Sequence, residues 1–327
     1  AIVQDSTILF MKGYGLREVG TTDSVNEHTT FRLASVSKCF APLLTGLLVE
    51  DSILRWNDRV VDHYYDFELK SRKNTDSLRL THVLSHTTGL PYHTYTTLVE
   101  DGLELPRMLG ELKNVNLIAM PGELYSYQNL AYSIIAEVIR YRTGKSYEQW
   151  MSEKIFDRLD MDDASMTYDA IVQNENVAQP HLHWRKGWKA TTISNTYYNV
   201  GPAGGVNASI SDMSQWLIAM LGSRKGFVSE KTLDKIFTPV VKAKSKNRYF
   251  RIWVGRSDSH YALGWRVFDY GGQKVVFHAG AVQGYRGLIA MVPVGLHAKR
   301  APSASTTRSS ASVGSGWGLG KRASTSV

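Results

Sequence analysis

FRLASVSKCFAPLLTGLLVE, residues 31–50, contains the pattern that decides the fold and its chemistry. From Ser35 to about Asp51 the apolar residues recur at helical spacing, which predicts a helix. Pro42 falls inside this helix, removes the bond to the carbonyl of Lys38, and is expected to kink it. Ser35 and Lys38 are three residues apart, so their side chains share one helix face, with Cβ atoms roughly 5–6 Å apart.

This spacing suits an activated nucleophile and its base. The positive end of the helix dipole favours an alkoxide at Ser35. Lys38 can accept the hydroxyl proton if burial lowers its pKa toward about 7–8. No other Ser in the chain has a Lys three positions later. The alternative interpretation is a capping Ser followed by a surface Lys.

A second group of candidates lies in PGELYSYQNLAY, residues 121–132. Tyr127 and Asn129 flank one residue of an extended segment, so both side chains point the same way. A phenol here can share a proton with Lys38, and an amide can bind a substrate carbonyl. The stretch Tyr197-Tyr198-Asn199 has the same spacing and remains a rival, ranked below Tyr127.

The third group lies in FHAGAVQGYRG, residues 277–287. His278 and Gly280 end an alternating strand, and Gly280 lets a substrate backbone approach closely. The N–H of Ala281 can pair with that of Ser35 to form an oxyanion hole. The alternative for His278 is an ordinary strand histidine.

The order of the elements predicts an α+β fold. Residues 1–10 read as two short strands, and the stretches around 260–291 alternate as antiparallel strands. Helices dominate between them, so we expect one antiparallel sheet built from both chain ends, with an inserted helical domain. The expected boundaries are 1–60 and 195–294 for the sheet domain, 61–194 for the helical domain, and 295–327 for a disordered tail rich in Ser, Thr and Gly.

The three groups, in this order, resemble the serine hydrolases of the class C β-lactamase and penicillin-binding superfamily, which includes D,D-carboxypeptidases, D-aminopeptidases and family VIII esterases. The resemblance covers about residues 1–293 and extends to the stretches THVLSHTTGLP, TGKSYEQWM and GPAGGVNASISDMSQWL. It implies a β-lactamase/transpeptidase-like fold. It also implies Ser35 as acylating nucleophile, Lys38 and Tyr127 as the proton-handling pair, Asn129 as substrate ligand, and the strand of His278 and Gly280 at the cleft.

Three features depart from the family pattern. The strand triad is His-Ala-Gly, where class C β-lactamases carry Lys-Thr-Gly, and a histidine binds a carboxylate by charge only when protonated. This favours a peptidase or esterase over an efficient β-lactamase. The chain also begins within the first strand, and after residue 294 a Ser-rich basic tail replaces the family's last strand and C-terminal helix.

Composition excludes several other classes. The net charge of +8 owes five units to the segment 295–327, so nucleic acid is not an expected partner. The longest apolar run near the front, residues 40–49, is too short to cross a membrane. His82 and His86 have a zinc-like spacing, but Val83 occupies the place of the Glu base, so neither a metal nor a cofactor is expected.

The sequence therefore predicts a metal-independent serine hydrolase that acts through an acyl-enzyme on a small-molecule or peptide substrate: a peptidoglycan-like peptide, an ester or a β-lactam. The alternative is a non-catalytic or damaged family member that binds peptidoglycan or serves as a scaffold. No leader is visible, so the protein is either cytoplasmic or, if a leader has been removed, periplasmic or secreted.

Overall fold

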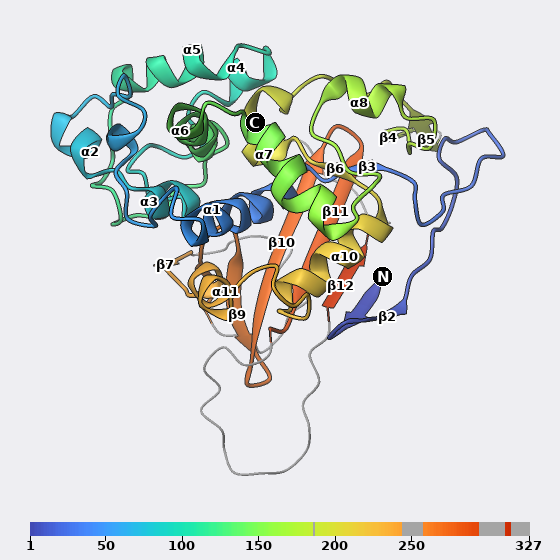
Figure 1. The fold of residues 1–327 in the computed structure, drawn as a ribbon. Helices are drawn as coiled ribbons and strands as arrows, with labels where there is room; N and C mark the ends of the chain where they lie inside the picture. The colour runs from blue at the N-terminus through green and yellow to red at the C-terminus, as the bar shows by residue number, and fades with distance from the viewer. Residues whose placement is uncertain (186, 244–257, 294–310, 315–327) are drawn as a thin grey trace, which may run out of the picture.

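An eight-stranded antiparallel sheet is assembled from both ends of the chain, in the order β2-β1-β12-β11-β10-β9-β8-β7 (Figure 1). The structure is a computed structural model and describes residues 1–185, 187–243, 258–293 and 311–314. The expected α+β fold is confirmed. The strands of this sheet are β1 (Ile2–Gln4), β2 (Thr7–Phe10), β7 (Val241–Lys242), β8 (His260–Tyr261), β9 (Arg266–Tyr270), β10 (Gln273–Val282), β11 (Tyr285–Met291) and β12 (Ala311–Gly314).

Two short two-stranded ladders lie outside this sheet. One joins β3 (Phe31–Arg32) to β6 (Asn207–Ala208), just before the segment that carries Ser35. The other is the hairpin of β4 (His181–Trp184) and β5 (Gly187–Ala190), which falls within the segment expected to be helical.

Helices are the main regular elements of the chain between the terminal strands. Figure 1 shows α1, α10 and α11 across one face of the sheet, with α2 to α6 gathered beyond its end. The α-helices are α1 (Phe40–Glu50), α2 (Arg72–Ser77), α3 (Leu80–Leu84), α4 (Thr96–Glu100), α5 (Leu105–Gly110), α6 (Ile134–Thr143), α7 (Tyr147–Met151), α8 (Tyr168–Gln173), α9 (Gly201–Gly204), α10 (Ile210–Met220) and α11 (Glu230–Phe237). Shorter helical segments are η1 (Ala34–Cys39), η2 (Val60–Asp62), η3 (Glu111–Asn114), η4 (Ala131–Ser133), η5 (Ser152–Phe156, a π-helix), η6 (Asp157–Leu159) and η7 (Tyr198–Val200). In the part of the chain that the structure describes, no helix is long and apolar enough to cross a membrane.

The expectation of a disordered tail over 295–327 is wrong at Ala311–Gly314. These residues form β12, which pairs with β1 on one side and with β11 on the other. Strand pairing uses backbone N–H and C=O groups, which Ser and Gly supply as well as apolar residues do. The composition therefore hides the strand, and the rest of this expected tail lies outside the described residues.

The segment 31–51 also differs from the expected single kinked helix. It begins as the 3₁₀ helix η1 and continues as α1 from Phe40. Pro42 lies in the first turn of α1, where the backbone N–H it lacks would have no partner within the helix. Pro42 therefore fits the first turn of α1 without interrupting a hydrogen bond within that helix.

Helix α1 is held in the core by almost its whole surface. Its residues from Phe40 to Leu48 are all buried, and the ring of Phe40 stacks on Trp216 of α10 with 4.5 Å between the centroids. Burial of each large apolar side chain contributes about 1.5–3 kcal/mol. This anchoring fixes η1, which immediately precedes α1, against the sheet.

The turns of the sheet set the register of β10. Gly271 and Gly272 join β9 to β10 with φ of 58° and 76°, the left-handed values that a two-residue hairpin turn of type I′ requires. The resulting register pairs His278 with Ile289 of β11, and both are buried. Side chains alternate along a strand, so His278 and Gly280 face the same side as Val276, which belongs to the core beneath the helices.

Candidate active site

The backbone of η1 places Ser35 at the surface of an otherwise buried segment. Ala34 and Val36 are buried, whereas Ser35 is partly exposed. Ala34 adopts a φ of 49°, in the left-handed region that costs a residue with a Cβ roughly 1–2 kcal/mol. A strained residue directly before an accessible hydroxyl is a feature of functional sites.

Lys38 connects Ser35 with the helical part of the molecule. Its Nζ lies 3.4 Å from Ser35 Oγ. The same amine donates a hydrogen bond of 2.8 Å to Asn129 Oδ1 and another of 2.8 Å to the carbonyl oxygen of Ala203. The alternative of a surface Lys does not hold, because Lys38 is fully buried.

The surroundings of Lys38 favour its neutral form. Burial lowers the pKa of Lys38 well below its usual value, and the charge of Arg266 lowers it further. A neutral amine has two N–H groups and one lone pair. In the neutral form, the oxygens of Asn129 and Ala203 can accept both N–H groups, and the lone pair can then take the hydroxyl proton of Ser35.

Tyr127 lies beside this amine. Lys38 Nζ is 4.8 Å from the centre of the Tyr127 ring. Burial raises the pKa of Tyr127 well above its usual value, and the interaction of its phenol with the Ser35 side chain offsets only part of that effect. Tyr127 therefore carries its proton at neutral pH, while the neighbouring Lys38 is driven to give its proton up.

The rival stretch Tyr197-Tyr198-Asn199 is engaged elsewhere. The Tyr197 hydroxyl donates to Glu100 at 2.9 Å, the Tyr198 hydroxyl donates to Asn207 at 2.7 Å, and the Asn199 amide donates to the carbonyl of Val99 at 3.0 Å. The structure thus groups Ser35, Lys38, Tyr127 and Asn129, and leaves the rival outside this group.

Strand β10 forms the wall beside Ser35. A Cβ at Gly280 would lie 2.8 Å from Ser35 N and 2.3 Å from the carbonyl oxygen of Leu33, so the two backbones touch. Pairing of β10 with β9 ends at Phe277, whereas pairing with β11 continues to Val282. One backbone edge of residues 278–282, including the N–H of Ala281, is therefore free of β9 next to the Ser35 backbone.

His278 is placed differently from a carboxylate-binding residue. It is 1% exposed, its Nδ1 lies 3.0 Å from the carbonyl oxygen of Ala279, and its Nε2 lies 3.2 Å from the hydroxyl of Tyr261. A carbonyl only accepts, so Nδ1 carries the proton and Nε2 accepts from Tyr261. Burial lowers the pKa of His278 well below its usual value, and the charge of Arg266 lowers it further. His278 is neutral here.

Sequence reasoning missed Arg266, which lies near Tyr127 and Tyr261. Its guanidinium carbon lies 5.9 Å from the ring centre of Tyr127 and 5.7 Å from that of Tyr261. In the sequence, Arg266 is the single charged residue of the apolar run ALGWRVF, and this pattern could have pointed to a buried functional cation. The carbonyl of Ala203 was also missed, and no side-chain pattern can reveal a backbone acceptor.

His86, which the sequence suggests only as half of a metal-binding pair, lies among aromatic rings. Its ring centre lies 4.3 Å from that of Tyr127, 4.9 Å from Tyr132 and 4.9 Å from Tyr261. His82 instead accepts a hydrogen bond from the N–H of Arg79 at the start of α3. Among the residues that the structure describes, no group of three or more His, Cys, Asp or Glu side chains is arranged to hold a metal ion.

Comparison with known proteins gives a family match over nearly the whole described chain. A family model described as Beta-lactamase matches residues 1–311. The unguisins hydrolase ungD' of Aspergillus campestris is 28% identical over 302 residues, which cover 89% of this chain and 55% of that protein. Protein flp of Staphylococcus aureus is 22% identical over 297 residues, covering 89% of this chain and 56% of that protein. The chain thus spans about half the length of these curated relatives.

Solved structures share the fold. The octameric penicillin-binding protein homologue from Pyrococcus abyssi superposes with a TM-score of 0.79 at 21% identity, over 97% of this chain and 68% of that one. A D-stereospecific amidohydrolase from Streptomyces superposes with a TM-score of 0.68 at 16% identity, over 90% of this chain and 85% of that one. At such identities the likeness extends to the fold alone.

Proposed function

Because this chain belongs to the Beta-lactamase family, we propose that it is a serine hydrolase that cleaves an ester, amide or lactam through an acyl-enzyme on Ser35. One observation carries the proposal. The buried Lys38 amine lies 2.8 Å from Asn129 Oδ1, 2.8 Å from the carbonyl oxygen of Ala203 and 3.4 Å from Ser35 Oγ, within reach of the hydroxyl proton.

Acylation begins with this pair. As Ser35 Oγ attacks the substrate carbonyl, its proton passes to the neutral Lys38, and a bond forms between Oγ and the carbonyl carbon. The N–H groups of Ser35 and Ala281 stabilise the negative charge on the carbonyl oxygen. When the bond to the leaving group breaks, the Tyr127 phenol gives its proton to that group and is reprotonated from Lys38.

Deacylation repeats these steps with water as the nucleophile. Lys38 accepts a proton from the attacking water, a bond forms between the water oxygen and the acyl carbon, the acyl–Ser35 bond breaks, and Ser35 Oγ takes the proton from Lys38. The products are the free acid and the leaving group. The pKa of Lys38 is lowered and that of the neighbouring Tyr127 is raised. These opposite shifts suit Lys38 to act as the base and Tyr127 to act as the proton donor.

The neutral His278 lacks the positive charge that a Lys at this strand position would offer to a substrate carboxylate. His278 is neutral and hydrogen-bonded to Tyr261, so it offers no positive charge to the carboxylate of a β-lactam or a peptidoglycan-like peptide. Arg266 is the cation beside Tyr127, and we assign it, rather than His278, to any substrate carboxylate. In the free protein, Asn129 Oδ1 accepts a hydrogen bond from the Lys38 amine and so orients that amine. Asn129 Oδ1 can bind a substrate only if the substrate replaces Lys38 as its hydrogen-bond partner.

Hydrolysis of p-nitrophenyl acetate tests the proposal, with nitrocefin and a D-Ala-D-Ala peptide in parallel. We expect a burst of p-nitrophenolate equal to the enzyme concentration, absent from Ser35→Ala and unchanged in Ser37→Ala. Ser37 is a matched control because its buried hydroxyl accepts the N–H of Val206 at 3.0 Å. A cooperative thermal transition without turnover of any of these compounds contradicts the proposal and favours a non-catalytic scaffolding or peptidoglycan-binding role.

A further inference from the structure

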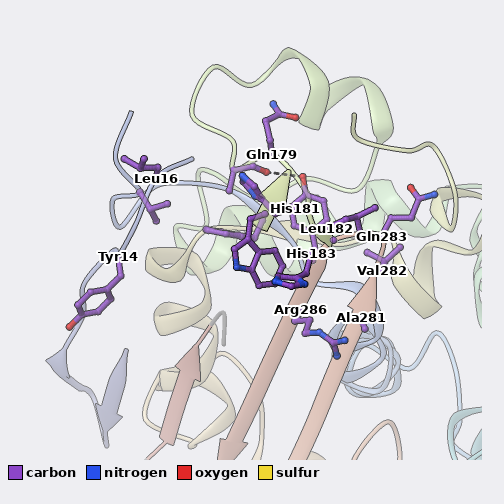
Figure 2. A pocket seen from close by; sticks show the side chains of 16 residues that line it. Tyr14, Leu16, Gln179, His181, Leu182, His183, Ala281, Val282, Gln283 and Arg286 are labelled. Atoms are coloured by element: carbon purple, nitrogen blue, oxygen red, sulfur yellow. Dashed lines mark hydrogen bonds between the residues drawn. The ribbon is translucent and has the colours of Figure 1, made fainter. Parts of the chain in front are cut away.

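A cavity of about 470 Å³ opens at the end of β10 and β11, one residue beyond the wall that touches Ser35. Its size is within the range of about 300–1,000 Å³ typical of small-molecule sites. Ala281 and Val282 contribute from β10, Tyr285 from β11, and Leu182 and Trp188 from the β4–β5 hairpin. Figure 2 shows the hairpin side chains gathered over the strand ends that carry Ala281 and Arg286.

The cavity is built on the segment that holds Ser35. Ala34, directly before Ser35, belongs to one hydrophobic cluster with Val282 and Tyr285, and Phe31 packs against that cluster. Val282, Tyr285 and Phe31 also line the cavity. A ligand in the cavity therefore contacts the same side chains that fix the position of the nucleophile's backbone.

The walls offer mainly rings and apolar surface. The Tyr285 hydroxyl donates to the carbonyl of Ala178 at 2.8 Å, which leaves the ring for the cavity. The ring centres of Trp188 and His183 lie 5.2 Å apart at 79°, so these two rings support each other edge to face. Trp188 is nevertheless 44% exposed and Leu182 is 48% exposed. Rings fixed in place but left open to solvent are suited to an apolar or aromatic ligand group.

The hairpin is held in position without a ligand. A Cβ at Gly284, in the turn between β10 and β11, would lie 2.6 Å from His181 N, so the turn and the hairpin are in direct contact. His181 Nε2 also accepts the N–H of Val19 at 3.0 Å, which ties the hairpin to the N-terminal segment. The cavity is therefore largely preformed.

The position of Tyr127 indicates which part of a substrate, the acyl part or the leaving group, would enter the cavity. The side chains around Tyr127 are Tyr92, His93, His86 and Arg266, and none of them lines the cavity. A leaving group must lie by Tyr127 to receive its proton. The cavity, in contrast, begins at Ala281, whose N–H we assign to the oxyanion hole.

We propose that this cavity is the acyl-group subsite, and that the substrates are esters or amides whose acyl part carries a bulky apolar or aromatic group. This inference rests on the proposed function, because it takes Ser35 as the nucleophile and Tyr127 as the proton donor to the leaving group.

Two esters with one leaving group test the inference: p-nitrophenyl acetate and p-nitrophenyl 4-phenylbutyrate. We expect kcat/KM at least about tenfold higher for the phenylbutyrate, the scale of discrimination that apolar pockets reach. Trp188→Ala should remove about tenfold of kcat/KM for the phenylbutyrate and leave the acetate unchanged. Trp184→Ala is the matched control, because Trp184 lies in the same hairpin and is 64% exposed but does not line the cavity.

A binding measurement separates this inference from the proposed function. Calorimetric titration of Ser35→Ala with 4-phenylbutyramide should give a Kd that rises about tenfold when Trp188→Ala is added and does not change with Trp184→Ala. Turnover of both esters with equal kcat/KM, unaffected by Trp188→Ala, overturns the inference and leaves the hydrolase intact. No turnover of either ester overturns the proposed function, and the titration then decides whether the cavity binds the aryl group.

Discussion

Replacement of Gly280 by Ala tests whether β10 forms the wall of a working site. The added Cβ would meet the carbonyl oxygen of Leu33 at 2.3 Å and the nitrogen of Ser35 at 2.8 Å. Relaxed carbon–oxygen contacts lie at roughly 3.3 Å or more, so β10 and η1 must separate by about 1 Å. The N–H of Ala281 would move with β10 away from Ser35.

The two consequences differ in size. Overpacking of this kind costs about 1–3 kcal/mol of unfolding free energy, which for a chain of 327 residues lowers Tm by about 1–4 °C. Misplacement of a reacting geometry by about 1 Å can cost roughly 10²-fold in rate. We therefore expect Gly280→Ala to remain folded but to react about 10²-fold more slowly with a fluorophosphonate, which needs the same oxyanion stabilisation as a substrate.

Gly287→Ala provides the matched control. Gly287 is the register partner of Gly280 on β11, and a Cβ there would meet its nearest neighbour at 3.4 Å, an ordinary contact. The assay is the second-order labelling rate by gel fluorescence, with Tm measured on the same samples. Wild-type labelling by Gly280→Ala, or equal losses in both variants, would refute the placement of the oxyanion hole between β10 and Ser35.

Three further predictions use the electrostatics of the site. Tyr127→Phe should slow fluorophosphonate labelling by about 10²–10⁴-fold, the usual range for an acid–base group. The control Tyr197→Phe removes a hydroxyl bonded to Glu100 and should leave the labelling rate unchanged. Equal rates in the wild type and both variants would exclude Tyr127 as an acid–base group. Arg266→Met should raise the pKa of Lys38, because Arg266 helps to lower it. The acidic limb of the pH profile of the labelling rate should then move to higher pH, whereas substitution of the exposed Arg107 by Met should not move it. An acidic limb that stays in place in Arg266→Met would argue against Lys38 as the base. Burial lowers the pKa of His278, so below about pH 6.5 the unfolded chain binds a proton that the folded protein does not. As the pH is lowered, denaturant titrations should therefore show the unfolding free energy falling by up to about 1.4 kcal/mol per pH unit because of this residue. His278→Gln should make this fall less steep, and the same slope in both proteins would contradict a neutral buried imidazole.

Much of the architecture follows from local sequence. The match of the Beta-lactamase family model over residues 1–311 confirms the family resemblance drawn from the motifs. Helix α10 begins where Ser209 and Asp212 form a capping box, and α6 ends at Gly144 in a left-handed conformation. Such signals depend on a few neighbouring residues and on steric rules, so the sequence reveals them directly.

Other features depend on long-range contacts. The segment Ala311–Gly314 becomes a strand only because β1 and β11 flank it. Burial of Lys38 requires the backbone of Ala203, 165 residues away, and the neutrality of His278 follows from Tyr261 and the surrounding core. The spacing of Ser35 and Lys38 indicated a pair of groups, but their protonation states are set by residues that only the tertiary fold brings near.

The most direct measurement is the site of covalent modification by a fluorophosphonate, determined by fragmentation mass spectrometry. Trypsin should release the peptide LASVSK, residues 33–38, which contains both Ser35 and Ser37. The account predicts one adduct per chain, on Ser35, in the folded protein at neutral pH. An adduct on Ser37 or on a serine outside this peptide, or no adduct on a protein that melts cooperatively, would contradict it.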